Sequence, residues 1–236
     1  MVYVQAVLDG SKNMKTCVII PTYNESRAIA GIIKQVRNQG LEVIVIDDGS
    51  TDDTSAISET AGARVIRNAT NQGKGASLIK GFDYALKNGF ESAITMDGDG
   101  QHQPQDLPFF IRLGEYSNSG ILIGNRMLKV KNMPMLRLLT NKTMSWIISI
   151  VAGQKIPDTQ CGFRLIKRQV LEKVQLGTTK YETESEIIIE ASRQGFKIES
   201  VPIKSIYSGE KSKINPFIDT CRFIKLMARE LWTMKR

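Results

Sequence analysis

Residues 41–50, LEVIVIDDGS, form a run of apolar and β-branched residues that closes on Asp47 and Asp48. A short apolar run bounded by turn residues predicts a buried strand. The segments TCVIIPTYN (16–24) and SAITMDGDGQHQP (92–104) are built in the same way, with an apolar run that ends in polar residues. We therefore predict three buried strands whose polar residues lie at the carboxyl end.

Helical segments separate these strands. Apolar residues of segment 25–40 recur at helical spacing and so share one face of a helix; they are Ala28, Ile29, Ile32, Ile33 and Val36. Residues 51–62 and 74–90 are also expected to be helical, and residues 63–68 to form a further strand. The alternation of strand and helix predicts an α/β fold, with a mostly parallel central sheet and helices on both faces.

In sheets of this kind, ligands bind beyond the carboxyl ends of the strands. The polar strand ends at 21–25, 47–48 and 97–99 should therefore converge on one cleft.

The second half of the chain is less regular. Its expected helices are 104–117, 134–153, 183–195 and an amphipathic helix at 215–236, and its expected strands are 119–127, part of 161–174 and 196–207. No linker-like composition interrupts the chain. We predict one main domain over residues 1–210, followed by a C-terminal loop and amphipathic helix over 211–236.

Composition narrows the class of partner and of compartment. The 236 residues include 32 Lys and Arg against 24 Asp and Glu, and the resulting charge of +8 favours anionic partners. Nucleic acid is disfavoured as a partner because no single element clusters Arg, Lys and aromatic residues.

Three widely spaced cysteines without a CxxC pair argue against a disulfide framework or zinc site and favour a reducing, cytoplasmic compartment. The chain begins without a signal-peptide pattern, and no apolar run approaches the ~20 residues of a spanning helix, so we expect a soluble or peripheral protein.

Asp97 and Asp99 stand two residues apart at the end of an expected strand, where their charges would repel. A divalent cation that bridges them to a diphosphate removes this penalty. Mg²⁺ and Mn²⁺ prefer oxygen ligands and commonly bind through one or two carboxylates and substrate phosphates. Gln101 would add a carbonyl oxygen. The alternative is a solvated turn, since DGDG is a favourable turn sequence.

Other motifs carry two interpretations each. One of Asp47 and Asp48 would accept hydrogen bonds from a nucleoside, and the other would cap the following helix. The glycine-rich segment 68–77, with Lys74, offers N–H groups and a cation to phosphate, although it lacks the P-loop and G-x-G-x-x-G spacings and is equally typical of a plain turn. His102, the single histidine, is either a ligand or base or, as we favour, a hydrogen-bonded structural residue.

Taken together, these motifs resemble the family 2 glycosyltransferases, inverting enzymes that use nucleotide-diphosphate sugars. The segments that carry the resemblance are VIIPTYNES, VIVIDDGSTDDT, NQGKGASLIKGFDYA, MDGDGQHQPQDLP, IGNRM and DTQCGFRLIKR, which cover most of residues 16–170 in the family's order. Within the family, the chain looks closest to the dolichol-phosphate mannosyltransferase and polyprenyl-phosphate glycosyltransferase branch. The resemblance implies a GT-A fold, with residues 1–210 as the catalytic domain.

The resemblance also implies roles for individual residues. Nucleotide binding falls to Pro21, Tyr23, Asn24, Glu25, Asp47, Asp48, Lys74, Asp97 and Gly98. A Mg²⁺ or Mn²⁺ ion would be held by Asp97, Asp99 and Gln101. The acceptor phosphate would be bound by Arg126, Arg137, Asn141, Ser212 and Lys213, with Asp97, Asp99 and Arg126 as the catalytic group. The family often has Ser at the position of Asn141, and an arginine near the position of Ser205.

The chemistry of the acceptor separates two versions of this activity. A hydroxyl acceptor needs a general base, whereas a lipid phosphate is already anionic and needs cations that position it. Glu184 and Glu186 are possible bases, but acids on a helix surface are expected to be solvated. Arg126 and Arg137 suit a phosphate. We therefore predict metal-dependent transfer from a GDP- or UDP-linked sugar to a polyprenyl phosphate. A sugar or protein hydroxyl acceptor, and a non-catalytic nucleotide-binding module, are the alternatives.

A lipid acceptor implies contact with a membrane. The segment MSWIISIVAG (144–153) and the last helix are expected to lie in the membrane interface. In the last helix, the apolar residues Phe217, Phe223, Leu226, Leu231 and Trp232 accompany Lys225, Arg229, Lys235 and Arg236. We expect peripheral association at the cytoplasmic face, either direct or through a membrane partner protein.

Overall fold

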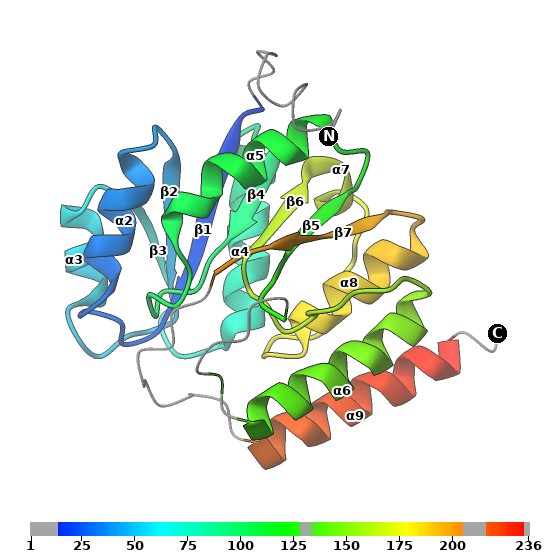
Figure 1. The fold of residues 1–236 in the computed structure, drawn as a ribbon. Helices are drawn as coiled ribbons and strands as arrows, with labels where there is room; N and C mark the ends of the chain where they lie inside the picture. Colours follow the sequence, from blue (N-terminus) through cyan, green and yellow to red (C-terminus); the bar gives the residue numbers. More distant parts are fainter. Residues whose placement is uncertain (1–13, 128–132, 134, 205–215, 234–236) are drawn as a thin grey trace.

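The computed structural model describes residues 14–127, 133, 135–204 and 216–233, and Figure 1 shows their arrangement. Seven strands form one sheet in the order β3-β2-β1-β4-β6-β5-β7. The strands are β1 (Thr16–Thr22), β2 (Glu42–Asp47), β3 (Arg64–Arg67), β4 (Ser92–Thr95), β5 (Ile121–Asn125), β6 (Arg164–Lys167) and β7 (Ile198–Pro202). All neighbouring pairs are parallel except those of β6, which runs antiparallel to β4 and β5. The predicted mostly parallel sheet is therefore confirmed.

Helices cover both faces of the sheet, as the alternation of strands and helices predicted (Figure 1). One layer holds α2 (Ile29–Arg37), α3 (Thr54–Thr60) and α5 (Leu107–Tyr116), which follows the short helix η1 (Pro104–Asp106). The opposite layer holds α4 (Lys74–Lys87), α7 (Arg168–Leu171) and α8 (Thr183–Arg193). Two long helices, α6 (Met135–Ala152) and α9 (Pro216–Thr233), lie beyond α8 at one end of the molecule.

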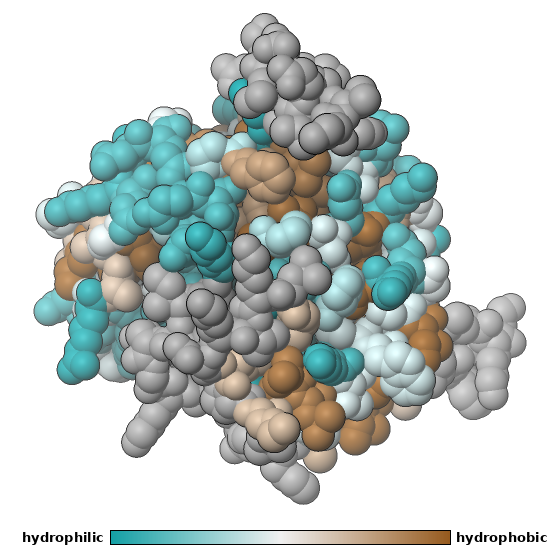
Figure 2. Space-filling view, in the orientation of Figure 1, coloured by the Kyte–Doolittle hydropathy of each residue, from teal (hydrophilic) through white to brown (hydrophobic). Residues whose placement is uncertain are grey.

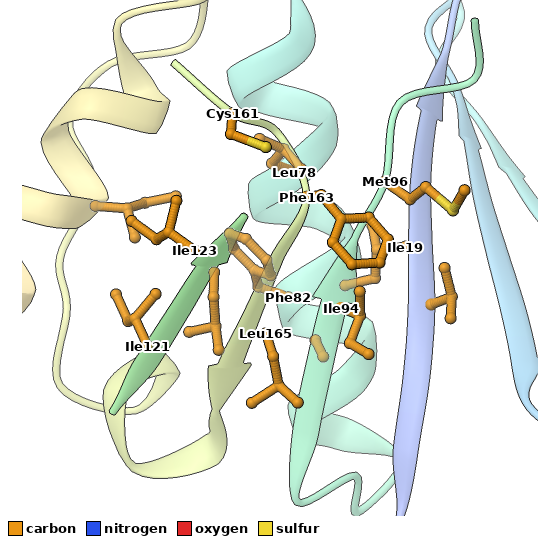
Figure 3. Close-up of a cluster of buried hydrophobic side chains, with 14 of the residues drawn as sticks. Ile19, Leu78, Phe82, Ile94, Met96, Ile121, Ile123, Cys161, Phe163 and Leu165 are labelled. Carbon is orange, nitrogen blue, oxygen red and sulfur yellow. The ribbon is translucent and has the colours of Figure 1, made fainter. Parts of the chain in front are cut away.

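The core fills the space between the sheet and these helices. Figure 3 shows Leu78 and Phe82 of α4 close to Ile19 of β1 and Ile94 of β4. Gly81 allows this close approach, because a Cβ at that position would lie 2.5 Å from Cγ2 of Ile19. Burial of these apolar residues supplies the main driving force for the fold.

The register of the strands brings their carboxyl ends to one edge of the sheet. Thr22 of β1 is paired with Asp47 of β2, and Asp47 is paired with Arg67 of β3. On the other side of β1, Ile19 is paired with Thr95, the last residue of β4. The loops that follow β1, β2 and β4 are therefore neighbours in space.

The last helix is part of the packed core, which corrects one prediction. Phe223 and Leu226, expected at a membrane interface, are 6% and 3% exposed, and their neighbour Met227 is 7% exposed. These three residues belong to the hydrophobic core, and ion pairs join α9 to α8, one between Arg229 and Glu186 and one between Arg193 and a carboxylate of α9. The predicted boundary at residue 210, and the side chains of Phe217, Leu231, Trp232, Lys235 and Arg236, lie outside the described residues.

Among the helices that the structure describes, none combines the length and the apolar character that crossing a bilayer requires.

Candidate active site

Hydrogen bonds join the loops that follow β1 and β2. Asn24, in the left-handed region with φ of +54°, donates its backbone N–H to Oγ of Ser50 over 2.9 Å. Its Oδ1 accepts from the backbone N–H of Thr51 over 2.9 Å. The N–H of Glu25 donates to Oγ1 of Thr54, also over 2.9 Å. These hydrogen bonds hold the loop that contains Asn24 and Glu25 in one conformation. Both residues are predicted to bind the nucleotide, together with the half-buried Pro21 and Tyr23.

The loop after β4 closes onto the same edge. A Cβ at Gly98 would lie 3.0 Å from Cγ2 of Thr22 and 3.5 Å from Cγ of Glu25. Gly98 thus permits the acidic turn to lie directly beside the end of β1. The predicted convergence of the three polar strand ends is confirmed by these contacts.

Asp47 and Asp48 are both turned into the protein. The carboxylate of Asp47 is fully buried and accepts from the N–H and Oγ of Ser50, over 2.9 and 2.5 Å, and from Oγ of Ser55. Asp48, 4% exposed, accepts from Nδ2 of Asn68. Asp47 does not cap α3, whose N-cap is Asp53, but its oxygens hold the turn at Ser50 and bind the hydroxyl of Ser55 in the first turn of α3.

The glycine-rich segment 68–77 allows close packing between helices in this structure. Asp48 accepts hydrogen bonds from the N–H groups of Gln72 and Gly73, over 2.8 and 2.7 Å, and so holds the segment in place. A Cβ at Gly75 would lie 1.9 Å from Oγ1 of Thr183. The glycines therefore allow α4 to approach the start of α8, and the N–H of Ala76 is already bonded to the carbonyl of Thr179. The phosphate-cradle interpretation fails for these groups because protein occupies the space beside them.

Lys74 is held between two acids. Its Nζ lies 2.6 Å from Oδ1 of Asp97 and 3.2 Å from Oε2 of Glu184. Burial would lower the pKa of Lys74, but the two carboxylates outweigh it and raise that pKa above its ordinary value. Burial would likewise raise the pKa of Asp97, but the charge of Lys74 holds it well below its usual range. Asp97 is therefore ionised at neutral pH.

The donor set at the end of β4 fits a small divalent cation. Asp97 and Asp99 are partly exposed carboxylates, and Oδ1 of Asp99 accepts from the N–H of Gln101 over 2.9 Å. In the described part of the chain, no group of three or more His, Cys, Asp or Glu side chains is arranged to hold a metal. Two carboxylates completed by an amide oxygen and by substrate phosphates are, however, a normal site for Mg²⁺ or Mn²⁺.

His102 lies beneath this turn and is 3% exposed. Its Nδ1 accepts from the N–H of Asp97 over 3.3 Å, and its Nε2 lies 3.9 Å from Sγ of Cys161. Burial, with the charges of Arg126 and Lys74, lowers the pKa of His102 to about 4. The imidazole is thus neutral at pH 7 with its proton on Nε2, which agrees with the structural interpretation we favoured.

Arg126 follows β5 and is 5% exposed. Its Nε and Nη2 donate to Oδ2 and Oδ1 of Asp158 over 2.8 and 2.9 Å, and its backbone N–H donates to Oδ2 over 3.0 Å. Sequence reasoning missed Asp158, although it opens the DTQCGFR motif. The signal available was an acid in that motif, but nothing in the sequence pairs it with an arginine 32 positions earlier.

Helix α6 brings the other predicted acceptor residues to this side. Arg137, Asn141 and Ser145 share one face because they are four residues apart. Oγ of Ser145 accepts from the N–H of Thr159 over 2.9 Å, which sets that face against the segment that holds Arg126. Asn141 is 8% exposed, and its Nδ2 has no hydrogen-bond partner among the described residues. Ser212 and Lys213 lie outside the described residues.

The prediction that Glu184 and Glu186 are solvated is wrong. The side chain of Glu184 is 15% exposed and pairs with Lys74, and that of Glu186 is 2% exposed. Glu186 accepts from the N–H groups of Gly177 and Thr178, over 3.1 and 2.9 Å. Both acids are enclosed because α8 is packed between α4 and α6.

The sheet, the acidic turn beyond β4 and the braced loops of β1 and β2 define a glycosyltransferase with the GT-A fold. The chain matches the model of "Glycosyl transferase family 2" over residues 17–175 and belongs to that family. The enzyme class predicted from the sequence is therefore confirmed.

Relatives and solved structures agree with this assignment. The chain is 32% identical over 205 residues to the polyprenol monophosphomannose synthase of Mycolicibacterium smegmatis, covering 80% of this chain and 76% of that one. It is 30% identical over 214 residues to the UDP-N-acetylglucosamine–dolichyl-phosphate N-acetylglucosaminyltransferase of Methanococcus voltae, covering 81% and 85%. The glucosyl-3-phosphoglycerate synthase of Mycobacterium tuberculosis, crystallised with Mn²⁺, UDP and glucosyl-3-phosphoglycerate, shares the fold. Its TM-score is 0.72 at 16% identity, and the match covers 98% of this chain and 82% of that one. The predicted resemblance to the polyprenyl-phosphate branch is confirmed by the first two relatives.

Proposed function

We propose that this glycosyltransferase moves a sugar, with inversion, from a GDP- or UDP-linked donor to a polyprenyl phosphate in a reaction that depends on Mg²⁺ or Mn²⁺. The observation that carries the choice of acceptor is the state of Glu184. Its side chain is 15% exposed and its carboxylate lies in one charge cluster with Lys74 and Asp97, so we assign Glu184 to the donor side and not to the base that a hydroxyl acceptor needs.

On the donor side, Asp97, Asp99 and Gln101 would hold the ion. When bound, the ion neutralises the charge that develops on the departing nucleoside diphosphate. Lys74 adds a cation beside Asp97. Pro21, Tyr23, Asn24, Glu25 and Gly98 border the nucleotide, while Asp47 and Asp48 hold the loops that shape its site. The bound UDP and Mn²⁺ of the mycobacterial structural neighbour support this part.

On the acceptor side, Asp158 fixes the orientation of the guanidinium of Arg126, which we assign to the acceptor phosphate. The buried Nδ2 of Asn141 is a hydrogen-bond donor suited to a phosphate oxygen. Arg137, one turn earlier on α6, adds a second guanidinium. A lipid phosphate placed here is already anionic and attacks without a general base. The names of the two relatives that act on lipid phosphates support this acceptor.

Contact with a membrane would occur through the outer face of α6. Met135, Leu139, Trp146 and Ile150 recur at helical spacing and are 87%, 64%, 66% and 57% exposed. Figure 2 shows hydrophobic residues gathered at the lower edge of the molecule, where Figure 1 places α6 and α9. Exposed Lys142 and Lys225 lie on these two helices and suit anionic headgroups. We place the protein at the cytoplasmic face, bound directly or with a membrane partner.

The test uses the full chain with a panel of radiolabelled GDP- and UDP-sugars, with Mn²⁺, Mg²⁺ or a chelator. The acceptors are a short polyprenyl phosphate and, as its matched control, the corresponding polyprenol. We expect metal-dependent label in the organic phase with the phosphate and none with the alcohol. Transfer to the alcohol, or transfer that the chelator does not reduce, would refute the proposal.

A further inference from the structure

Residues 158–162, which we name the floor segment, connect Asp158, which binds Arg126, to Gly162, which lies against Asp97. At the acceptor end, the side chain of Asp158 is fully buried and binds Arg126 through both carboxylate oxygens. A buried ion pair of this kind fixes the guanidinium in one orientation, because a planar fork of donors matches a carboxylate in two parallel hydrogen bonds.

At the donor end, Gly162 lies directly against the carboxylate of Asp97. A Cβ at Gly162 would lie 2.7 Å from Oδ2 and 3.0 Å from Oδ1 of Asp97. The carbonyl of Gly162 accepts from Oγ1 of Thr95, the last residue of β4, over 2.6 Å. The absence of a side chain at this position therefore determines where the carboxylate of Asp97 can lie.

Between the two ends, the segment is anchored to the core. Arg164, 1% exposed, donates from Nε to the carbonyl of Cys161 and from Nη2 to the carbonyl of Thr159, each over 2.9 Å. Sγ of Cys161 would lie 2.9 Å from a Cβ at Gly124, so it is packed against β5. Figure 3 shows Cys161 and the following Phe163 among the buried side chains. The segment is thus a short connection that is anchored to the core at Thr159 and Cys161.

We propose that the floor segment positions the donor-side carboxylate and the acceptor-side arginine relative to each other. Gly162 acts through Asp97, and Asp158 acts through Arg126, so both are positioning residues. This inference rests on the proposed function, since it assigns the two ends to a metal-bound donor and to a phosphate acceptor.

Substitutions at the two ends of the floor segment should cause different defects that can be measured separately. Gly162→Ala displaces the carboxylate of Asp97, and we expect Mn²⁺ affinity, followed by electron paramagnetic resonance of the unbound ion, to fall about 10–100-fold. The KM for a short polyprenyl phosphate, measured at saturating Mn²⁺, should change little. Asp158→Asn loosens Arg126 and should raise that KM about tenfold or more, because a displaced binding group loses contact with its substrate, with Mn²⁺ affinity unchanged.

Matched controls separate positioning from general destabilisation. Thr16→Val removes the buried hydrogen bond between Thr16 and Ser92 at the opposite end of the sheet, and should leave both constants unchanged at a comparable loss in Tm. If Asp158→Asn does not fold, Asp158→Glu retains the charge and shifts it by one methylene, and should give the same selective rise in KM.

The inference is overturned if each floor variant changes both constants equally, or if neither changes. A wild-type protein that binds no Mn²⁺ and transfers no sugar would instead refute the proposed function. The two failures are therefore distinguishable by the behaviour of the wild type.

Discussion

The two sides of the cleft are constructed differently. On the donor side, Asp47 and Asp48 accept hydrogen bonds chiefly from backbone N–H groups, hydroxyls and an amide of neighbouring loops. On the acceptor side, Asp158 accepts two side-chain hydrogen bonds from Arg126, in an ion pair that is almost completely buried. The loops around Asp47 and Asp48 are therefore held mostly by hydrogen bonds with neutral groups, besides an ion pair of 3.6 Å between Arg67 and Asp47. The orientation of Arg126 on the acceptor side depends on one buried charge pair whose partners cannot be removed singly without cost.

Loss of a metal ligand should have the largest effect and should act on the donor side alone. For Asp99→Ala we expect kcat for metal-dependent transfer to fall by about 10²–10³-fold or more, because the leaving diphosphate loses its counter-charge. Asp53→Ala, which removes an exposed carboxylate at the start of α3, is the matched control and should retain activity. Equal kcat values for Asp99→Ala and wild type would show that the turn is a solvated acidic turn.

Breaking the ion pair tests the acceptor side. Arg126→Ala leaves Asp158 buried and unpaired, and should lower the free energy of unfolding by about 3–5 kcal/mol. It should also raise KM for the acceptor far more than KM for the donor.

The double variant Arg126→Met with Asp158→Leu separates these two effects. It should recover most of the stability, measured by urea unfolding, but not the affinity for the acceptor. Equal effects of Arg126→Ala on both KM values would contradict a phosphate site at Arg126.

A variant of the exposed face of α6 tests the proposed membrane contact without altering the buried face of the same helix. Trp146→Ser with Ile150→Ser removes two exposed apolar side chains, and should weaken binding to anionic liposomes about tenfold or more, since burying each such side chain is worth about 1.5–3 kcal/mol. Co-sedimentation measures this, with Thr143→Ala on the same helix as the control. Unchanged co-sedimentation would place the membrane contact elsewhere.

Asn141→Leu tests the unpartnered amide. A buried donor without a partner costs about 1–3 kcal/mol, so the free protein should be as stable as wild type or more stable. The acceptor KM should rise about tenfold, because a hydrogen bond to a charged phosphate is worth about 1.5–3 kcal/mol. A clear loss of stability in thermal unfolding would mean that the amide is bonded in the native protein.

The smallest expected effect is on the reactivity of the thiols. The labelling rates of Cys17 and Cys161 report how often β1 and the floor segment open. Burial raises the pKa of Cys17 in β1 and of Cys161 in the floor segment to about 12, so very little of either is the reactive thiolate at pH 8. Cys221 is exposed and should react first with a thiol reagent. In a Cys221→Ser background we expect no reaction on the same timescale at pH 8, and a rate that rises with pH. Rapid labelling of Cys161 but not Cys17 would show that the floor segment opens.

Local features of the sequence allowed much of the fold and part of the candidate site to be predicted. Short apolar runs alternate with segments of helical periodicity, and this pattern was sufficient to predict the sheet, its helix layers and the convergence of the polar strand ends. Both signals can be read because each is contained within a short window of sequence. The antiparallel placement of β6 was not predicted, since a short apolar run does not show its direction in the sheet.

The sequence by itself therefore determined the fold class, the family and the carboxylates of the acidic turn. Tertiary structure alone decided which polar residues pair with one another. Lys74 meets Glu184 across 110 positions, and Arg126 meets Asp158 across 32. It likewise placed Phe223 in the core and Trp146 on the surface, although both belong to amphipathic helices. The physical reason is that burial and charge pairing depend on neighbours supplied by distant parts of the chain, which no local pattern specifies.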